Sequence, residues 1–269
     1  MTPDAWWLAY LLLGFFSGFM AGLLGLGGGA IMVPLLVMIF SATGVPHEHV
    51  LHLALGTSMA TIIFTAWSST RAHHAHGAVI WDVVKAFSPG IVFGTLLGTL
   101  VAARVSTRGL AVFFACFITL VAVQMMFNLK PAARRGLPGR AGLAGVGAGI
   151  GMVSALAAIG GGSMTVPYLT WCNVPVQRAI GTSAAVGIPI AVAGSLGYLW
   201  NGWGQSGLPP AAFGYIYLPA LVCLIFASML TAPLGARLAH RLPVSTLKRA
   251  FAGVLVLLAG KMLWGVFSV

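Results

Sequence analysis

A glycine-rich stretch inside a long apolar run constrains this chain more than any other feature. The run extends from Ala5 to Phe40 and contains Gly25-Leu26-Gly27-Gly28-Gly29-Ala30-Ile31-Met32-Val33-Pro34. Adjacent glycines hold a helix poorly, because each costs about 1 kcal/mol relative to alanine. The sequence therefore predicts a broken helix in an apolar environment. Exposed backbone N–H and C=O groups at such a break are tolerated only where protein or a polar cavity covers them.

The composition places these apolar runs in a membrane. Of the 269 residues, 59% are hydrophobic and 6% are charged, whereas a soluble domain carries about 25% charged residues. Eight apolar blocks stand out, at 5–40, 49–69, 83–104, 109–129, 141–172, 176–201, 211–239 and 245–268. They lack the alternation of membrane barrel strands, and most reach the roughly 20 residues of a membrane-spanning helix. We expect an all-α integral membrane protein in which residues 1–269 form a single transmembrane domain.

The second half of the chain repeats the first. Ala158-Ile159-Gly160-Gly161-Gly162-Ser163-Met164-Thr165-Val166-Pro167 matches the first glycine stretch at a shift of 133 residues. Gly56-Thr57-Ser58 returns as Gly181-Thr182-Ser183 at a shift of 125 residues. Ordered matches of this kind indicate internal duplication. We predict repeat one at 5–129, a linker at 130–140 and repeat two at 141–269.

The positions of Lys and Arg suggest how the repeats are oriented. If blocks one and five each cross the membrane once, the repeats are parallel and the 14 basic residues divide seven against seven. If each block folds back at its glycines, the repeats are inverted and the division is 11 against 3, with Arg104, Arg108 and Lys261 on the poorer side. The positive-inside rule favours the uneven division. We therefore predict two inverted repeats, each a glycine-broken helical hairpin plus three transmembrane helices, with a cytoplasmic linker and both termini outside.

The net charge of +11 would suggest nucleic acid as the partner of a soluble protein. In this chain the basic residues cluster in short loops, where they set the topology, so we expect a lipid bilayer and no nucleic acid as partner. The first residues, Met1 to Ala5, lack the basic start of a signal peptide. We expect them to begin the mature protein.

The scarcity of acids favours an anionic substrate. Asp4, Glu48 and Asp82 are the only acids in the sequence, and all three lie near block ends. This disfavours a proton or sodium relay built on a carboxylate within the membrane. A helix that restarts after a glycine break presents N–H groups without partners and a positive dipole end, which together bind anions. The candidate residues at the two breaks are Gly27, Gly28, Gly29, Ala30, Gly160, Gly161, Gly162 and Ser163. The alternative is that these glycines only allow tight helix packing.

Duplicated hydroxyls form a second group of candidates. Thr57 and Ser58 recur as Thr182 and Ser183, and each pair lies several residues inside its apolar block. Neutral hydroxyls donate hydrogen bonds to anionic oxygens. The alternative is that they bond to carbonyls of their own helices. We expect the duplicated pairs to bind a small anionic substrate.

The histidines and cysteines give weaker signals. His73, His74 and His76 lie beside Arg71 without Cys or carboxylate partners, so a basic cytoplasmic loop explains them better than zinc does. Three more histidines near the start of block two read as surface residues: His47, His49 and His52. Cys116, Cys172 and Cys223 have unrelated spacings, typical of buried small residues. We expect no metal, no cofactor and no catalytic residue.

These motifs resemble those of the sulfite exporter TauE/SafE family, also called the toluene sulfonate uptake permeases. The resemblance rests on the duplicated glycine stretch, Gly25 to Pro34 in its first copy, and on the two Gly-Thr-Ser motifs. It covers nearly the whole chain and implies transport of sulfite or organosulfonates across the bacterial inner membrane. The second repeat departs from the pattern, because Ala155 and Ala158 stand where the first repeat has Gly22 and Gly25.

Three functions remain open at this point. The first is an exporter of small sulfur-containing anions, since an inside-negative potential drives an anion outward with about 2.3 kcal/mol per charge and 100 mV. The second is an anion channel of the same architecture. The third is a membrane enzyme with a histidine-bound metal, which the absence of acids and of a His-x-x-x-His pair disfavours. The oligomeric state is not determined by the sequence.

Overall fold

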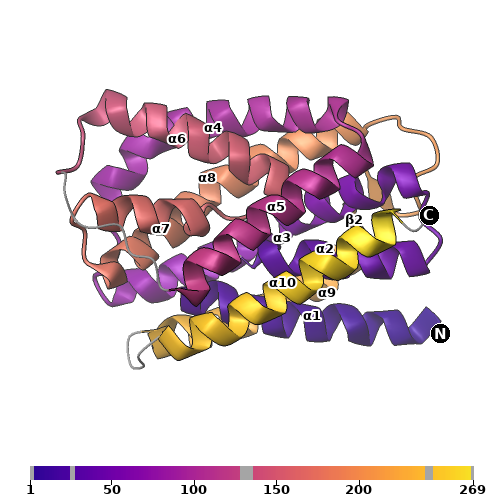
Figure 1. Cartoon of the computed structure of the whole chain (residues 1–269), viewed down its shortest axis with the longest axis horizontal. Helices are drawn as coiled ribbons and strands as arrows, with labels where there is room; N and C mark the ends of the chain where they lie inside the picture. Colours follow the sequence, from indigo (N-terminus) through magenta and orange to yellow (C-terminus); the bar gives the residue numbers. More distant parts are fainter. Residues whose placement is uncertain (1–2, 25–27, 128–135, 240–244, 268–269) are drawn as a thin grey trace.

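The chain folds into an elongated bundle of helices (Figure 1). The computed structural model describes residues 3–24, 28–127, 136–239 and 245–267. The first half of the chain forms α1 (Pro3–Leu24), α2 (Gly29–Ala42), α3 (His47–Ala75), α4 (Trp81–Arg104) and α5 (Thr107–Met126). The second half forms α6 (Arg140–Ala157), α7 (Gly162–Trp171), α8 (Val176–Gly202), α9 (Leu218–Ala239) and α10 (Ser245–Phe267).

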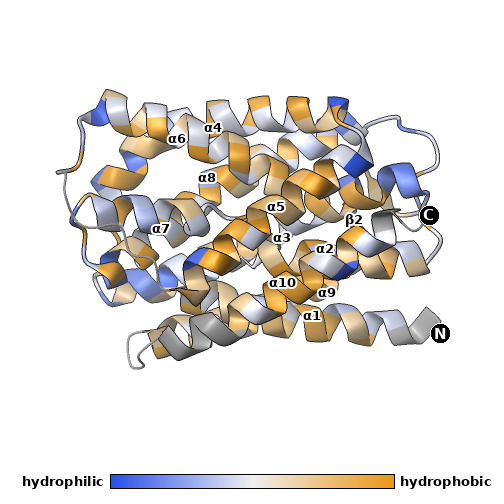
Figure 2. Cartoon of the chain, viewed as in Figure 1, coloured by the Kyte–Doolittle hydropathy of each residue, from blue (hydrophilic) through white to orange (hydrophobic). Residues whose placement is uncertain are grey.

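Seven of the described helices are long and apolar enough to cross a membrane: α1, α3, α4, α5, α6, α8 and α9. Helices α2 and α7 are shorter, with 14 and 10 residues. The sides of the bundle are largely apolar (Figure 2), and large side chains such as Trp67 and Trp264 are exposed there. Exposed apolar side chains over this much of the surface suit contact with lipid tails rather than water. The prediction of an all-helical, multi-pass membrane protein is confirmed.

The first apolar block folds back on itself at its glycines. Helix α2 returns alongside α1, so that the rings of Tyr10 and Phe40, near the far ends of the hairpin, have centroids 6.5 Å apart. The fifth block divides in the same way, into α6 and α7. The helices restart at Gly29 and Gly162. The glycine-broken hairpins are thus present in both halves.

The two ends of the bundle carry different parts of the chain. Helix α1 begins and α10 ends on the right in Figure 1, at the end that also carries strands β1 (Ala212–Phe213) and β2 (Ile216–Tyr217); we call this the β end. Helix α5 ends and α6 begins at the opposite end, on the left, which we call the linker end. Helix α1 starts from the β end and α6 starts from the linker end.

The exposed basic side chains divide unevenly between these ends. Among the described residues, the basic side chains near the helix ends at the linker end are Arg71, Lys85, Arg140, Arg178 and Arg237. Those at the β end are Arg104, Arg108 and Lys261. The other six basic residues, among them the three in the linker, have no described side chains. Among the described residues, exposed basic side chains are therefore more numerous at the linker end than at the β end.

Corresponding helices of the two halves pack in corresponding ways. Helix α1 packs against α9, while its counterpart α6 packs against α4; α3 packs against α8, and α5 against α10. Glycines permit the close approaches in the first two pairs. A Cβ on Gly18 would lie 2.5 Å from the Ser228 backbone, and one on Gly151 would lie 2.5 Å from the Ile91 carbonyl oxygen. Tight helix packing thus accounts for these two glycines, which lie outside the breaks.

One apolar block is not helical throughout. The sequence suggested a continuous block over 211–239, but residues 212–217 form a short antiparallel ribbon, and α9 begins only at Leu218. Two prolines precede the ribbon, and Gly214 has a φ of 52° between its strands. Proline removes a backbone donor and a positive φ interrupts a helix. Apolarity alone therefore overstated the length of this helix.

Candidate functional site

The two glycine breaks have nearly the same backbone geometry. Gly28 precedes α2 with φ 78° and ψ −15°, and Gly161 precedes α7 with φ 76° and ψ −14°. Glycine reaches this left-handed region without the strain that other residues suffer. No side chain caps either N-terminus. The first N–H groups of each helix, at Gly29 and Gly162, therefore remain free of intrahelical partners.

The two breaks lie against each other in the middle of the bundle. A Cβ added to Gly29 would overlap the carbonyl oxygen of Ala158, the residue that ends α6. Ala158 has φ 45° and ψ 44°, a left-handed conformation that alanine adopts at a cost. Alanine at position 158, where the first half of the chain has Gly25, therefore does not prevent the second break. Gly27 lies outside the described residues, whereas Ala30, Gly160 and Ser163 are buried beside the breaks.

A small cavity borders the second break. Its volume is about 10 Å³, and it is lined by residues of α1, α3, α8 and the break itself: Ala21, Thr65, Ala66, Ser69, Gly160, Ala184 and Gly187. A space of this size holds about one water molecule. The described residues beside the second break therefore leave room there for about one water molecule.

The duplicated threonines bind backbone amides at equivalent places. The Tyr217 N–H donates to the Thr57 hydroxyl, and the Ile80 N–H donates to the Thr182 hydroxyl, each at 3.0 Å. Tyr217 immediately precedes α9, and Ile80 immediately precedes α4. Each threonine oxygen therefore accepts a hydrogen bond from the residue that immediately precedes a helix. Each hydroxyl keeps its own hydrogen as a donor.

The duplicated serines differ from each other. The Ser58 hydroxyl lies 3.9 Å from the sulfur of Met32, in the first turn of α2, which is a weak contact. The Ser183 hydroxyl donates to the Ile180 carbonyl of its own helix at 2.8 Å. Both side chains are fully buried. The structure thus brings Ser58 to the start of α2, and for Ser183 it shows the bond to its own helix that was weighed as the alternative.

The sequence analysis did not single out two further buried hydroxyls near the breaks. Thr165, in the first turn of α7, and Ser69, on the cavity wall, have no hydrogen-bond partner among the described residues. Buried polar groups without partners are rare enough to need an explanation. A signal for Ser69 was available in the sequence, since Thr57, Thr61, Thr65 and Ser69 recur every four residues and share one face of α3.

Three of the histidines do not lie where the sequence suggested, whereas His74 and His76 are exposed as expected. His73 is not in a surface loop: it is buried in the last turn of α3, and its Nε2 lies 3.2 Å from the Gly22 carbonyl oxygen. Its counterpart Tyr198 donates in the same way to the Ala155 carbonyl at 2.8 Å. His49 and His52 are also buried rather than exposed. The described residues contain no group of three or more His, Cys, Asp or Glu side chains placed to hold a metal ion.

Comparison with known proteins agrees with this architecture. Residues 10–262 match the family model described as sulfite exporter TauE/SafE. A probable membrane transporter protein of Haemophilus influenzae is 37% identical over 257 residues, covering 95% of this chain and 97% of that protein. The probable membrane transporter protein YunE of Bacillus subtilis is 27% identical over 279 residues, covering 96% and 98%. No solved structure matches. The chain therefore belongs to the sulfite exporter TauE/SafE family of membrane transporters.

Proposed function

We propose that this protein exports small sulfur-containing anions, such as sulfite or organosulfonates, across the bacterial inner membrane. The anion is held between the two halves, by the N-termini of α2 and α7 and by the buried hydroxyls around them. The observation that carries the proposal is the contact between the two uncapped breaks at Gly29 and Ala158. The start of α2 lies there against the segment that leads from α6 into α7. The free N–H groups and positive dipole ends of α2 and α7 suit an anion, and none of the acids Asp4, Glu48 and Asp82 lies in either break. The name of the family, sulfite exporter, supports sulfite as the type of substrate.

We also propose that the halves are inverted repeats, with the linker end in the cytoplasm and both termini outside. The opposite starting ends of α1 and α6 support the inversion. The excess of basic side chains at the linker end supports the orientation. An anion leaving towards the β end then moves down the membrane potential, which contributes about 2.3 kcal/mol per charge and 100 mV. Export therefore needs no coupling carboxylate.

The narrow space beside the second break favours a transporter over a channel. A channel conducts through a continuous polar pore, whereas the cavity beside the second break measures only about 10 Å³. In a transporter of this kind, the two halves would move against each other around a site near the middle of the membrane. The hairpins α1–α2 and α6–α7 would supply both helix N-termini to that site.

Transport of sulfite and organosulfonates into proteoliposomes tests the proposed function. We expect uptake of at least one such anion that rises when the potential is made positive inside the vesicle, with chloride as a poor competitor. Unitary currents in planar bilayers would instead identify a channel. An absence of flux for every sulfur anion tested would refute the proposed substrate class.

Cysteine accessibility tests the orientation. Gly136 at the linker end and Ser206 at the β end are both exposed. In intact cells Gly136→Cys should resist an impermeant thiol reagent, while Ser206→Cys should react. Permeabilised cells serve as the control, because both cysteines should react there. The reverse pattern in intact cells would contradict the orientation.

A further inference from the structure

An apolar groove lies at the β end, between α10 on one side and the end of α2 with the start of α3 on the other. Its volume is about 630 Å³. Most of its lining is apolar and comes from three helices, with Val37 and Met38 on α2, Val50 on α3, and Met262 and Trp264 on α10. The polar side chains of the lining are Ser41, His47 and Lys261. None of the described residues in this lining belongs to a glycine break, so the groove is separate from the proposed anion site.

The groove opens towards the surrounding membrane. Helix α10, which lies at the front of the bundle in Figure 1, packs against α5 and α2. Trp264 in the lining is 78% exposed, and Leu257, two turns earlier on the same face of α10, is 74% exposed. Exposed apolar side chains of this size suit contact with lipid tails. A lipid can therefore reach the groove from the side of the bundle.

Lys261 lies at the depth of the membrane–water boundary. It is exposed and stands six residues before Phe267, the last residue of α10, or about 9 Å along the axis at 1.5 Å per residue. A lysine at this depth lays its methylene groups on apolar surface and extends its ammonium group to the headgroups. Trp264, one turn later, is of the type enriched at this boundary. The groove thus has a charged mouth and an apolar floor.

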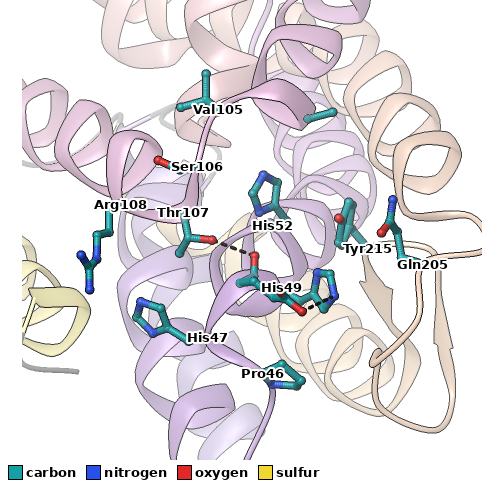
Figure 3. A pocket seen from close by; sticks show the side chains of 12 residues that line it. Pro46, His47, His49, His52, Val105, Ser106, Thr107, Arg108, Gln205 and Tyr215 are labelled. Atoms are coloured by element: carbon teal, nitrogen blue, oxygen red, sulfur yellow. Dashed lines mark hydrogen bonds and ion pairs between the residues drawn. The ribbon is translucent and has the colours of Figure 1, made fainter.

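The charge at this mouth is positive. No acid is among the described residues that line the groove. His47 also lines the neighbouring pocket of Figure 3, in which Arg108 is the basic side chain. The acid of that pocket, Glu48, has a side chain that is 77% exposed to solvent. Lys261 and Arg108, two of the three basic side chains described at the β end, therefore each share a pocket with His47.

We infer that this groove binds a glycerophospholipid with an anionic headgroup, taken from the leaflet at the β end. The phosphate of the lipid lies at Lys261, and an acyl chain follows the apolar floor between α2 and α10. A lipid tail is already in hydrocarbon before it binds, so apolar contact adds little selectivity. The preference for an anionic lipid comes from the lysine, and the groove determines where the chain lies. This binding requires neither the proposed anion site nor transport.

Two other occupants fit the groove less well. In a two-fold dimer the same surface of each copy meets the other, so Lys261 would approach the basic β end of a second copy, and like charges across an interface are unfavourable. A small soluble anion would pair with Lys261 but leave the apolar lining without a partner. A lipid satisfies both the charge and the lining.

Titration of the purified protein in detergent with single lipids, measured by native mass spectrometry, tests the charge. The probes are phosphatidylglycerol and phosphatidylcholine with identical acyl chains, which differ in the net charge of the headgroup. We expect the first phosphatidylglycerol to bind roughly fivefold tighter than the first phosphatidylcholine, the scale of one lysine near an anionic lipid. Lys261→Gln should remove this preference. Arg104→Gln should keep it, since Arg104 is also exposed near the β end but does not line the groove.

Gly265→Phe tests the apolar floor. Gly265 lines the groove, and a Cβ added to it meets no atom within 4 Å, so a phenyl ring can occupy the groove without a clash. The affinity for phosphatidylglycerol should fall by roughly tenfold. Gly260→Phe is the matched control, because Gly260 is also an exposed glycine of α10 with free space at its Cβ but lies outside the lining. Its affinity should equal that of the wild type, and thermal unfolding shows that each variant is folded.

Several results would overturn the inference. They are equal affinity of the wild type for the two lipids, a preference that survives Lys261→Gln, and wild-type affinity in Gly265→Phe. A dimer that Gly265→Phe dissociates would assign the groove to a second copy instead. Displacement of phosphatidylglycerol by glycerol phosphate at similar concentration would assign it to a soluble anion. None of these measurements involves transport, so the lipid site and the proposed function stand or fall separately.

Discussion

Replacing Gly28 or Gly161 by leucine is expected to abolish transport. A Cβ on Gly28 would lie 2.9 Å from the Ser17 carbonyl oxygen, and one on Gly161 would lie 2.5 Å from Cδ1 of Ile190. The remainder of a leucine side chain would fill the space in which the backbone approaches an anion. Both positions also have a positive φ, so leucine adds backbone strain of about 1–2 kcal/mol. Initial flux in proteoliposomes, per amount of folded protein, is the measurement.

Gly44→Leu is the control that separates the effect of backbone strain from the loss of the anion site. Gly44 has φ 82°, close to the 78° of Gly28, but no atom lies within 4 Å of an added Cβ. This variant should suffer the same backbone strain and still transport. If Gly28→Leu does not fold, Gly28→Ala is the second test, with thermal unfolding measured beside transport. Wild-type flux in both Gly28→Leu and Gly161→Leu would show that the breaks are not the site.

The sequence predicted the breaks in the first and fifth apolar blocks because they depend on local chemistry. Three glycines in an apolar run cannot continue a helix cheaply, and the same pattern recurred 133 residues later. The class of the fold followed from composition alone. The bounds of α4 and α8 differ from their predicted blocks by at most two residues, since charged or proline residues mark these ends.

The features that the sequence did not predict depend on tertiary contacts. His73 is polar and lies beside Arg71, yet it is buried because the Gly22 carbonyl meets it across the bundle. The ribbon before α9 depends on the Thr57 hydroxyl, which lies 160 residues away in the chain. His52 is buried where its Nε2 lies 3.0 Å from the Ala102 carbonyl oxygen of another helix. No periodicity along one segment encodes such contacts.

The buried serines give the prediction with the next largest effect. Ser58 is fully buried and makes only a weak contact with Met32, in the first turn of α2. No Lys or Arg lies in either Gly-Thr-Ser stretch, so neutral donors must hold an anion there. A hydrogen bond to a charged group contributes about 1.5–3 kcal/mol. Ser58→Ala should therefore raise the dissociation constant of a transported sulfur anion by roughly tenfold or more.

The second repeat provides a graded comparison for this prediction. Ser183→Ala should weaken binding less than Ser58→Ala, because the Ser183 hydroxyl must first give up its 2.8 Å bond to the Ile180 carbonyl. The double variant should bind more weakly than either single variant, since both residues would surround one anion. Ser195→Ala is the matched control: this buried serine of α8 donates to the Ala191 carbonyl at 2.7 Å and lies farther along the helix from Ser183. Titration of the purified variants with one sulfur anion measures all four constants. Affinities equal to wild type in Ser58→Ala, Ser183→Ala and the double variant would mean that these hydroxyls serve only their own helices, and that the anion is held by the backbone of the breaks alone.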